Sequence, residues 1–180
     1  NYITTYYPQV KVCVFLEPIP RIFQFLQGAD KILEAKDSEE SFDLCIVLDC
    51  GDATRLGDAV KFFETAKRTI CIDHHVSNQA FADKNKIVAD ASSASELVYD
   101  SMDPAKITKE IAECIYTGMI HDTGVFQYSC TSSHTMEVAG CLMDLGIDYP
   151  TIVDKTFYEK TFAQNKILGQ ALLKSRLYED

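Results

Sequence analysis

The chain has 180 residues, of which 47% are hydrophobic, and it carries a formal net charge of −10. A chain of this length forms one domain by default, or two very small ones, and its apolar fraction is that of an ordinary globular protein. The excess of acidic residues argues against binding along a long nucleic-acid duplex, which requires clustered Lys and Arg. It does not exclude a small phosphate ligand held through metal ions, because bound cations dominate the local charge.

The cysteines indicate a reducing compartment. None of the seven forms a Cys-x-x-Cys pair, and most lie in apolar runs. Free thiols are therefore favoured over a disulfide or zinc framework. The sequence shows neither a secretory signal peptide nor an apolar run long enough to span a membrane. We therefore expect a cytoplasmic protein without a membrane partner.

The N-terminal quarter contains weak signals. Residues 1–7 resemble the last turns of a helix, and Val10–Leu16, rich in Val and Phe, is predicted to form a strand. Pro20 is typical of a helix start, so we expect a short helix from there to Gly28.

Strand, helix and strand follow one another in the next segment. The apolar run Leu44–Leu48 is predicted to be a strand, Thr54–Lys67 has apolar residues on one helical face, and Thr69–Ile72 is a second β-branched run. This spacing is typical of a βαβ unit, whose strands are parallel and joined by a right-handed crossover. We therefore predict an α/β fold with a mainly parallel β-sheet flanked by helices on both faces.

The rest of the chain is predicted to be mostly helical. A Ser-x-x-Glu capping box at Ser93–Glu96 starts one helix, and Gly124 is suited to a left-handed turn that ends another. The predicted elements of this part are a short strand at Ile87–Val88 and helices over Ser93–Ser101, over Thr108–His121, from Ser132 or Ser133 to Gly146, and over Val153–Leu177.

Acidic and imidazole side chains gather at the ends of the two apolar strands. The first strand runs into Asp49–Asp52, and the second runs into Asp73–His75. Because parallel strands joined by a crossover end at the same sheet edge, Asp49 and His74 are expected to lie near each other. Carboxylate oxygens mixed with imidazole suit Mn²⁺, Mg²⁺ or Fe²⁺ better than metals that prefer thiolates.

Each of these side chains also has a structural interpretation. Asp52, which shortly precedes a predicted helix, is better explained as a helix cap, whereas Asp49 directly follows an apolar strand and is favoured as a metal ligand. His74 is favoured as a ligand over a hydrogen-bonded core histidine. Adjacent strand residues point to opposite faces, so His75, either on the other face from His74 or past the end of the strand, is expected to reach a substrate phosphate. Asp73 is expected to hold one of the imidazoles.

Two further positions stay open from the residues alone. Asp122, followed by Thr123 and Gly124, is either a contribution to the site or part of the turn that ends a helix. His121, beside Asp122, is either a contribution to the site or a surface residue. His134, at a predicted helix start, is better explained as a surface residue.

Four ordered motifs carry a resemblance to a known family. They are Leu48–Asp52, Ile72–Asn78, Ser93–Tyr99 and Gly118–Tyr128. In this order they resemble the successive motifs of the DHH phosphoesterase family, and most closely its bacterial nanoRNase/pAp phosphatase branch, also called bifunctional oligoribonucleases. The resemblance covers essentially the whole chain.

The resemblance implies a metal-dependent phosphoesterase. In the family, the aspartate matching Asp49 bridges two Mn²⁺ ions, the residues matching His74 and Asp122 bind one of them, and the histidine matching His75 contacts the scissile phosphate. Such a pair of ions activates a bridging water and clamps the oxygens of an in-line displacement. Mg²⁺ or Co²⁺ would suit the same ligands.

The implied substrates are short oligoribonucleotides, linear dinucleotides or pAp, and a homodimer is compatible with the family. A cyclic-dinucleotide phosphodiesterase, a pyrophosphatase-like enzyme and a non-catalytic nucleotide-binding module are the alternatives.

Two family features have no counterpart in the chain. The family's first motif, of the form His-x-x-Pro-Asp-x-Asp, supplies the remaining metal ligands, and no such stretch is present. The family also carries a Gly- and His-rich C-terminal substrate-binding domain, which has no counterpart before Asp180. We therefore expect residues 1–180 to be a catalytic domain truncated at its N-terminus, with little activity by itself.

Overall fold

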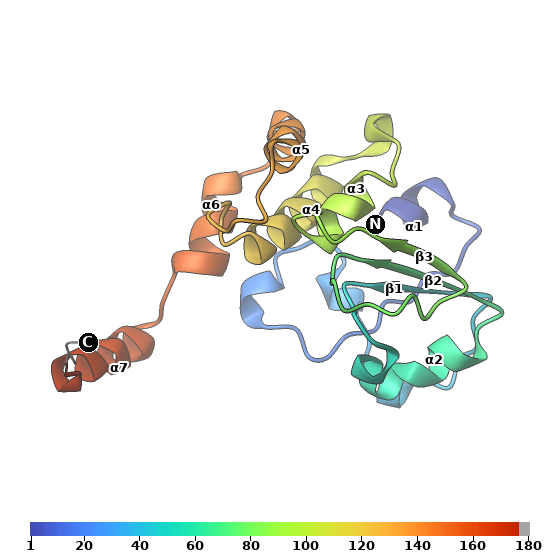
Figure 1. The fold of residues 1–180 in the computed structure, drawn as a ribbon, viewed down its shortest axis with the longest axis horizontal. Helices are drawn as coiled ribbons and strands as arrows, with labels where there is room; N and C mark the ends of the chain where they lie inside the picture. The colour runs from blue at the N-terminus through green and yellow to red at the C-terminus, as the bar shows by residue number, and fades with distance from the viewer. Residues whose placement is uncertain (177–180) are drawn as a thin grey trace.

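Three parallel strands form the centre of an α/β fold in the computed structural model, which describes residues 1–176 (Figure 1). β1 (Leu44–Leu48) pairs with β2 (Arg68–Asp73), and β2 pairs with β3 (Lys84–Ile87). The predicted βαβ unit and its parallel pairing are confirmed. β3 begins upstream of the strand predicted at Ile87–Val88. The sequence pattern missed this start because the Lys and Asn residues of β3 give little apolar signal.

Helices cover both faces of the sheet, as predicted (Figure 1). α3 (Ala94–Tyr99) lies over one face, where Lys86 Nζ of β3 donates a hydrogen bond of 3.0 Å to the carbonyl of Leu97. α2 (Val60–Thr65) lies on the other side of the sheet. Successive strand residues point to opposite faces, and the row of β2 that faces away from α3 is buried: Thr69, Cys71 and Asp73.

Most of the apolar core lies among the helices. α4 (Lys109–Asp122) packs against α3, α5 (Ser133–Asp144) and α6 (Tyr149–Val153). At the contact of α3 with α4, a Cβ on Gly118 would stand 2.0 Å from Ser95 Oγ, so glycine allows the helices to approach this closely. The buried apolar residues of this cluster are Ile107, Ile111, Ala112, Ile115, Tyr116, Met119, Ile120, Val138, Ala139, Leu142, Ile147 and Ile152.

Side-chain caps start the helices near the predicted positions. Thr108 caps α4 by accepting from the Ile111 N–H, and Ser93 caps α3. Ser132, not Ser133, caps α5. Gly146 has a φ of 75° just beyond the end of α5, in the left-handed region that favours glycine.

The prediction of a strand at Val10–Leu16 is wrong. The segment makes one isolated parallel bridge, between Phe15 and Leu33. Its alternating side chains Val10, Val12, Val14 and Leu16 are exposed. β-Branched residues fit an extended backbone, but a strand also needs a neighbour along its length, and within residues 1–176 this segment has only the bridge to Leu33.

The single helix predicted at Thr54–Lys67 is divided at Gly57. This residue has φ 52° and ψ −135°, which is not helical, so it kinks the 3₁₀ segment η4 (Ala53–Ala59), and the short α-helix α2 begins beyond the kink at Val60. The predicted apolar face contained Leu56, Val60, Phe63 and Ala66, which are half-buried, whereas the buried residue of α2 is Phe62.

The predicted helix Val153–Leu177 is also divided. α6 continues into a π-helical turn, η6 (Asp154–Tyr158), and a new helix, α7 (Phe162–Lys174), begins after it. A capping box made by Thr161 and Gln164 starts α7. α7 projects away from the rest of the chain and buries none of its residues (Figure 1). The predicted helix end at Leu177 lies outside the described residues.

The remaining elements are short: α1 (Tyr2–Tyr6), η1 (Arg21–Phe23), η2 (Ala29–Lys31), η3 (Ala35–Asp37) and η5 (Pro104–Lys106). The N-terminal helix is confirmed by α1, and the helix predicted from Pro20 to Gly28 is shortened to the 3₁₀ turn η1. No helix within residues 1–176 is long and apolar enough to cross a membrane.

Candidate metal centre

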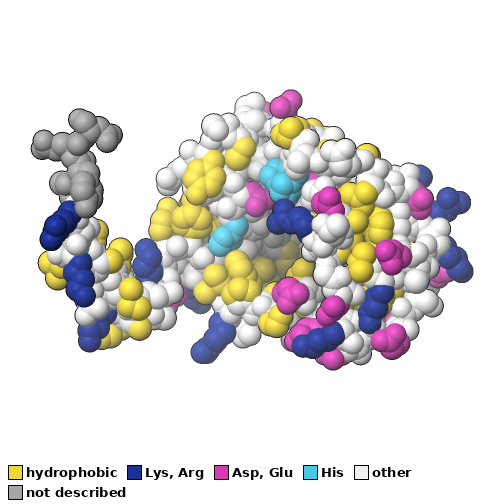
Figure 2. Space-filling view, turned by 60° about the horizontal axis from the view of Figure 1, so that its bottom comes forward, with side chains coloured by type: hydrophobic (Ala, Val, Ile, Leu, Met, Phe, Trp, Pro, Cys, Tyr) yellow, Lys and Arg dark blue, Asp and Glu magenta, His cyan; other side chains and the backbone are white. Residues whose placement is uncertain are grey.

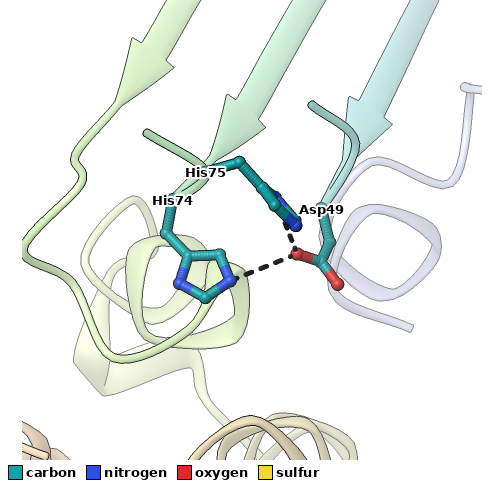
Figure 3. A group of neighbouring side chains, drawn as sticks. All are labelled: Asp49, His74 and His75. Atoms are coloured by element: carbon teal, nitrogen blue, oxygen red, sulfur yellow. Dashed lines mark ion pairs between the residues drawn. The ribbon is translucent and has the colours of Figure 1, made fainter. Parts of the chain in front are cut away.

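Three predicted site residues meet where β1 and β2 end (Figure 3). His74 Nε2 lies 3.4 Å from Asp49 Oδ1, and His75 Nδ1 lies 3.8 Å from the same oxygen. One ligand atom of each residue lies within 4.8 Å of the others. Asp49 extends the strand pairing by donating its N–H to the Ile72 carbonyl at 3.0 Å. Its φ of 55° is left-handed, and such strained backbone is typical of functional sites.

Asp122 reaches the same place from the end of α4. Its Oδ2 lies 3.9 Å from His74 Nε2. Burial raises the pKa of Asp122, and the negative charge of Asp49 raises it further. A carboxylate whose ionisation is opposed in this way is stabilised by a nearby cation.

The backbone selects one tautomer of His74. Its Nδ1 lies 3.2 Å from the carbonyl oxygen of Ala91, which can only accept a hydrogen bond. Nδ1 therefore carries the proton, and Nε2 of the neutral ring presents a lone pair towards Asp49 and Asp122. An imidazole held in this way is the usual arrangement of a metal-binding histidine.

His75 is held by a buried carboxylate. Its Nδ1 lies 2.7 Å from Asp73 Oδ1, and Asp73 has no exposed surface. Burial acts to raise the pKa of Asp73, but the hydrogen bonds from His75 and Asn78 outweigh it and hold that pKa below its usual value. Because Nδ1 is engaged with Asp73, Nε2 is the ring nitrogen of His75 left to meet a ligand.

Of the two positions expected for His75, the one past the strand end is observed, and the one on the opposite face from His74 is wrong. Both rings turn towards Asp49 (Figure 3). β2 ends at Asp73, so the alternation of side chains along a strand no longer applies to the two residues that follow it.

The other polar candidates lie outside this cluster. Asp52 caps η4, because its Oδ1 accepts from the Thr54 N–H at 2.7 Å, as predicted. His134 forms a surface pair with Asp100 at 3.0 Å. His121 is partly buried between Phe23 and Phe157, and desolvation lowers its pKa.

Asn78 is a site residue to which the sequence reasoning assigned no role. Its Nδ2 donates to Asp73 Oδ2 at 2.6 Å and to the carbonyl of Cys50 at 3.1 Å. It thereby joins the loop after β1 to the loop after β2. Its position three residues after His75 in a recognised motif was the available signal.

The site borders open space. A cavity of about 430 Å³ is lined by Leu48, Asp49 and Cys50 on one side and by Leu16 and Arg55 among others. Figure 2 shows a hollowed face with histidine and acidic side chains at the hollow. A small ligand therefore has access to this edge of the sheet.

The donor set fits a hard divalent cation. Two ligands of one ion with bonds of about 2.1 Å lie about 3 Å apart when adjacent in an octahedron and about 4.2 Å apart when opposite. The distances of His74 Nε2 from Asp49 (3.4 Å) and Asp122 (3.9 Å) match neither value but lie between them, so the three residues are close enough to share one ion. Two carboxylates with one imidazole are suited to Mn²⁺, Mg²⁺ or Fe²⁺.

Comparison with known proteins agrees with the motifs. Two curated relatives are the probable bifunctional oligoribonuclease and PAP phosphatase NrnA of Streptococcus mutans, 31% identical over 154 residues, and the bifunctional oligoribonuclease and PAP phosphatase NrnA of Bacillus subtilis, 28% identical over 151 residues. The matches cover 83% and 80% of this chain but 47% and 44% of the relatives. The chain thus spans less than half the length of these relatives.

A solved structure shares the fold. The crystal structure of an exopolyphosphatase-related protein from Bacteroides fragilis matches with a TM-score of 0.87 and 26% identity, covering 98% of this chain and 55% of that one. Residues 2–119 match the model of the DHH family, N-terminal domain. The chain therefore belongs to the DHH family.

Proposed function

We propose that this protein hydrolyses phosphoester bonds in short oligoribonucleotides, linear dinucleotides or pAp with the help of divalent cations. The observation that carries the proposal is the convergence of Asp49, His74 and Asp122, a carboxylate-imidazole set, at one sheet edge. The names of the curated relatives, bifunctional oligoribonuclease and PAP phosphatase, support the class of substrate.

Asp49, His74 and Asp122 would hold a cation, for which we propose Mn²⁺, with Mg²⁺ or Co²⁺ as substitutes. A bound cation lowers the pKa of water and polarises a phosphoryl oxygen. The Ala91 carbonyl keeps the Nε2 lone pair of His74 directed at the cation site.

His75 is proposed to bind the phosphate of the substrate. With Nδ1 donating to Asp73, Nε2 is the ring atom left to face the ligand. An imidazole whose other nitrogen is bonded to a buried carboxylate presents Nε2 to the ligand in a fixed orientation. His75 thus orients the phosphate, and Asp73 and Asn78 keep the ring in place.

The complete enzyme is proposed to use a second cation, bridged by Asp49, with further ligands and a substrate-selecting domain from outside residues 1–180. The side chain of Asp49 is 48% exposed, so its carboxylate has room for a second ion. We propose that residues 1–180 alone are weakly active. We also propose that the enzyme works in the cytoplasm and forms a homodimer.

Steady-state hydrolysis by the full-length protein tests the proposal. Substrates are pAp, a linear dinucleotide, a cyclic dinucleotide and pyrophosphate, each with Mn²⁺, Mg²⁺ or a chelator. We expect chelation to abolish turnover and Mn²⁺ to restore it. His74→Ala is expected to lower kcat/KM at least 100-fold, whereas His134→Ala, which removes a surface imidazole, should stay within twofold of wild type.

The panel also separates the alternatives. The exopolyphosphatase-related structural neighbour favours a phosphoanhydride substrate as the second candidate, and pyrophosphate cleavage without pAp hydrolysis would support it. Metal-independent nucleotide binding without any turnover would instead support a regulatory module and refute the enzyme.

A further inference from the structure

A buried carboxylate lies behind the metal centre and has no place in the mechanism above. Glu96, in the first turn of α3, is 3% exposed and is surrounded by Ser92, Ser93 and Thr135, each with no exposed surface. Burying a carboxylate is costly unless hydrogen bonds satisfy it. The neighbours of Glu96 therefore indicate what this side chain does.

Hydroxyl groups from two segments satisfy the Glu96 carboxylate. Oε2 accepts from Ser92 Oγ at 2.7 Å and from Thr135 Oγ1 at 2.6 Å, and Oε1 lies 3.4 Å from the Ser92 N–H. The Ser-x-x-Glu pattern predicted a capping box, in which Glu96 would bond the N–H of Ser93. Only half of that box forms: Ser93 caps the helix, while Glu96 turns to Ser92 instead.

This shift connects Glu96 to the metal centre. Ser92 directly follows Ala91, whose carbonyl accepts from His74 Nδ1. Glu96 holds Ser92 through both its backbone N–H and its hydroxyl. Thr135, at the start of α5, holds the same carboxylate from the other side. The position of the Ala91 carbonyl thus depends on a carboxylate that bridges two helices.

We propose that Glu96 is a positioning residue for His74. By fixing the Ala91–Ser93 turn, it keeps the Ala91 carbonyl where it selects the tautomer of His74 and directs Nε2 at the cation. The role in catalysis rests on the proposed function. The effect on the His74 ring does not, because the chain of contacts lies within the protein.

A purely structural Glu96 would behave differently from a positioning residue. Its loss would lower stability but leave the ring of His74 and its cation affinity unchanged. A matched control is Thr156→Val, because Thr156 is also buried and donates a hydrogen bond of 2.8 Å within its own helical segment, to the Ile152 carbonyl. It destabilises the fold without touching the Ala91 turn.

The test uses two variants. Glu96→Gln keeps the size of the side chain but replaces one of its two acceptor oxygens by an NH₂ group, so it cannot accept from the Ser92 N–H and from both hydroxyls at once. Ser92→Ala removes one link and keeps Glu96. The His74 ring is observed by ¹⁵N NMR in the metal-free full-length protein, and Mn²⁺ affinity is measured by calorimetry. We expect a single Nδ1–H tautomer in wild type, mixed tautomers in both variants, and Mn²⁺ binding weakened about 10-fold.

Wild-type ring signals and Mn²⁺ affinity in both variants would overturn the proposal, as would an equal loss of affinity in Thr156→Val. If the wild type neither binds Mn²⁺ nor hydrolyses pAp, the proposed function fails. The NMR result then still decides whether Glu96 positions His74. If Glu96→Gln does not fold, Ser92→Ala alone carries the test.

Discussion

Replacing Asp73 by asparagine tests the carboxylate behind His75. Asp73 uses both oxygens, because Oδ1 accepts from His75 and Oδ2 accepts from Asn78. Asparagine has the same shape but one oxygen, so its NH₂ group meets one of these donors whichever way the amide turns. An unsatisfied buried polar contact costs about 1–3 kcal/mol of stability.

The loss of activity should be larger than a stability loss explains. If the amide oxygen faces Asn78, then Nδ1 of His75 must accept from the amide instead of donating to a carboxylate, and the charge-assisted hydrogen bond that holds the ring in place is lost. Removing a partner of this kind typically costs 10–100-fold in affinity or activity. We expect Asp73→Asn to lower kcat/KM for pAp by about this factor while the protein stays folded.

The stability effect has a defined pH dependence. The hydrogen bonds hold the pKa of Asp73 below its usual value, so the stability of the ionised carboxylate is fully present above the ordinary pKa of about 3.9. It is lost as the pH falls through the lower pKa of the folded protein. The difference in unfolding free energy between wild type and Asp73→Asn should therefore shrink below about pH 4.

Urea unfolding and steady-state hydrolysis of pAp measure the two effects. Asp83→Asn is the matched control, because Asp83 accepts from the Thr69 N–H at 2.9 Å near the opposite end of β2. It should change stability without a specific loss of kcat/KM. A wild-type kcat/KM in Asp73→Asn, or an equal loss in the control, would refute the assigned role of Asp73.

The remaining predictions concern charge and packing. Asp122→Asn removes a half-buried charge that lies close to Asp49. It should therefore raise the Tm of the metal-free protein at pH 7 and abolish the further rise that Mn²⁺ gives to wild type. A lower metal-free Tm would contradict this. Gly118→Ala forces a Cβ against Ser95 and should destabilise by about 1–3 kcal/mol in urea, whereas Gly140→Ala, with open space in α5, should stabilise by about 0.5–1 kcal/mol. Equal effects of the two glycine changes would rule out the packing argument.

Patterns within a few residues of each other were the reliable guides. The apolar runs around Val47 and Cys71 form strands, and these two side chains are buried. The caps at Thr108 and Ser132 form because each hydroxyl bonds a nearby N–H. The strand predicted around Val12 failed because pairing needs a second segment, which no local pattern reports.

The amino-acid sequence by itself determined the parallel βαβ unit, the helix starts and the residue types at the strand ends. These depend on periodicity and short-range hydrogen bonds. Only the tertiary structure decided that Asp122 approaches His74, that Asp73 holds His75, and that Glu96 turns away from its capping box. Each of these contacts depends on how the backbone leaves a regular element or how separate elements pack, and neither is written in residue spacing.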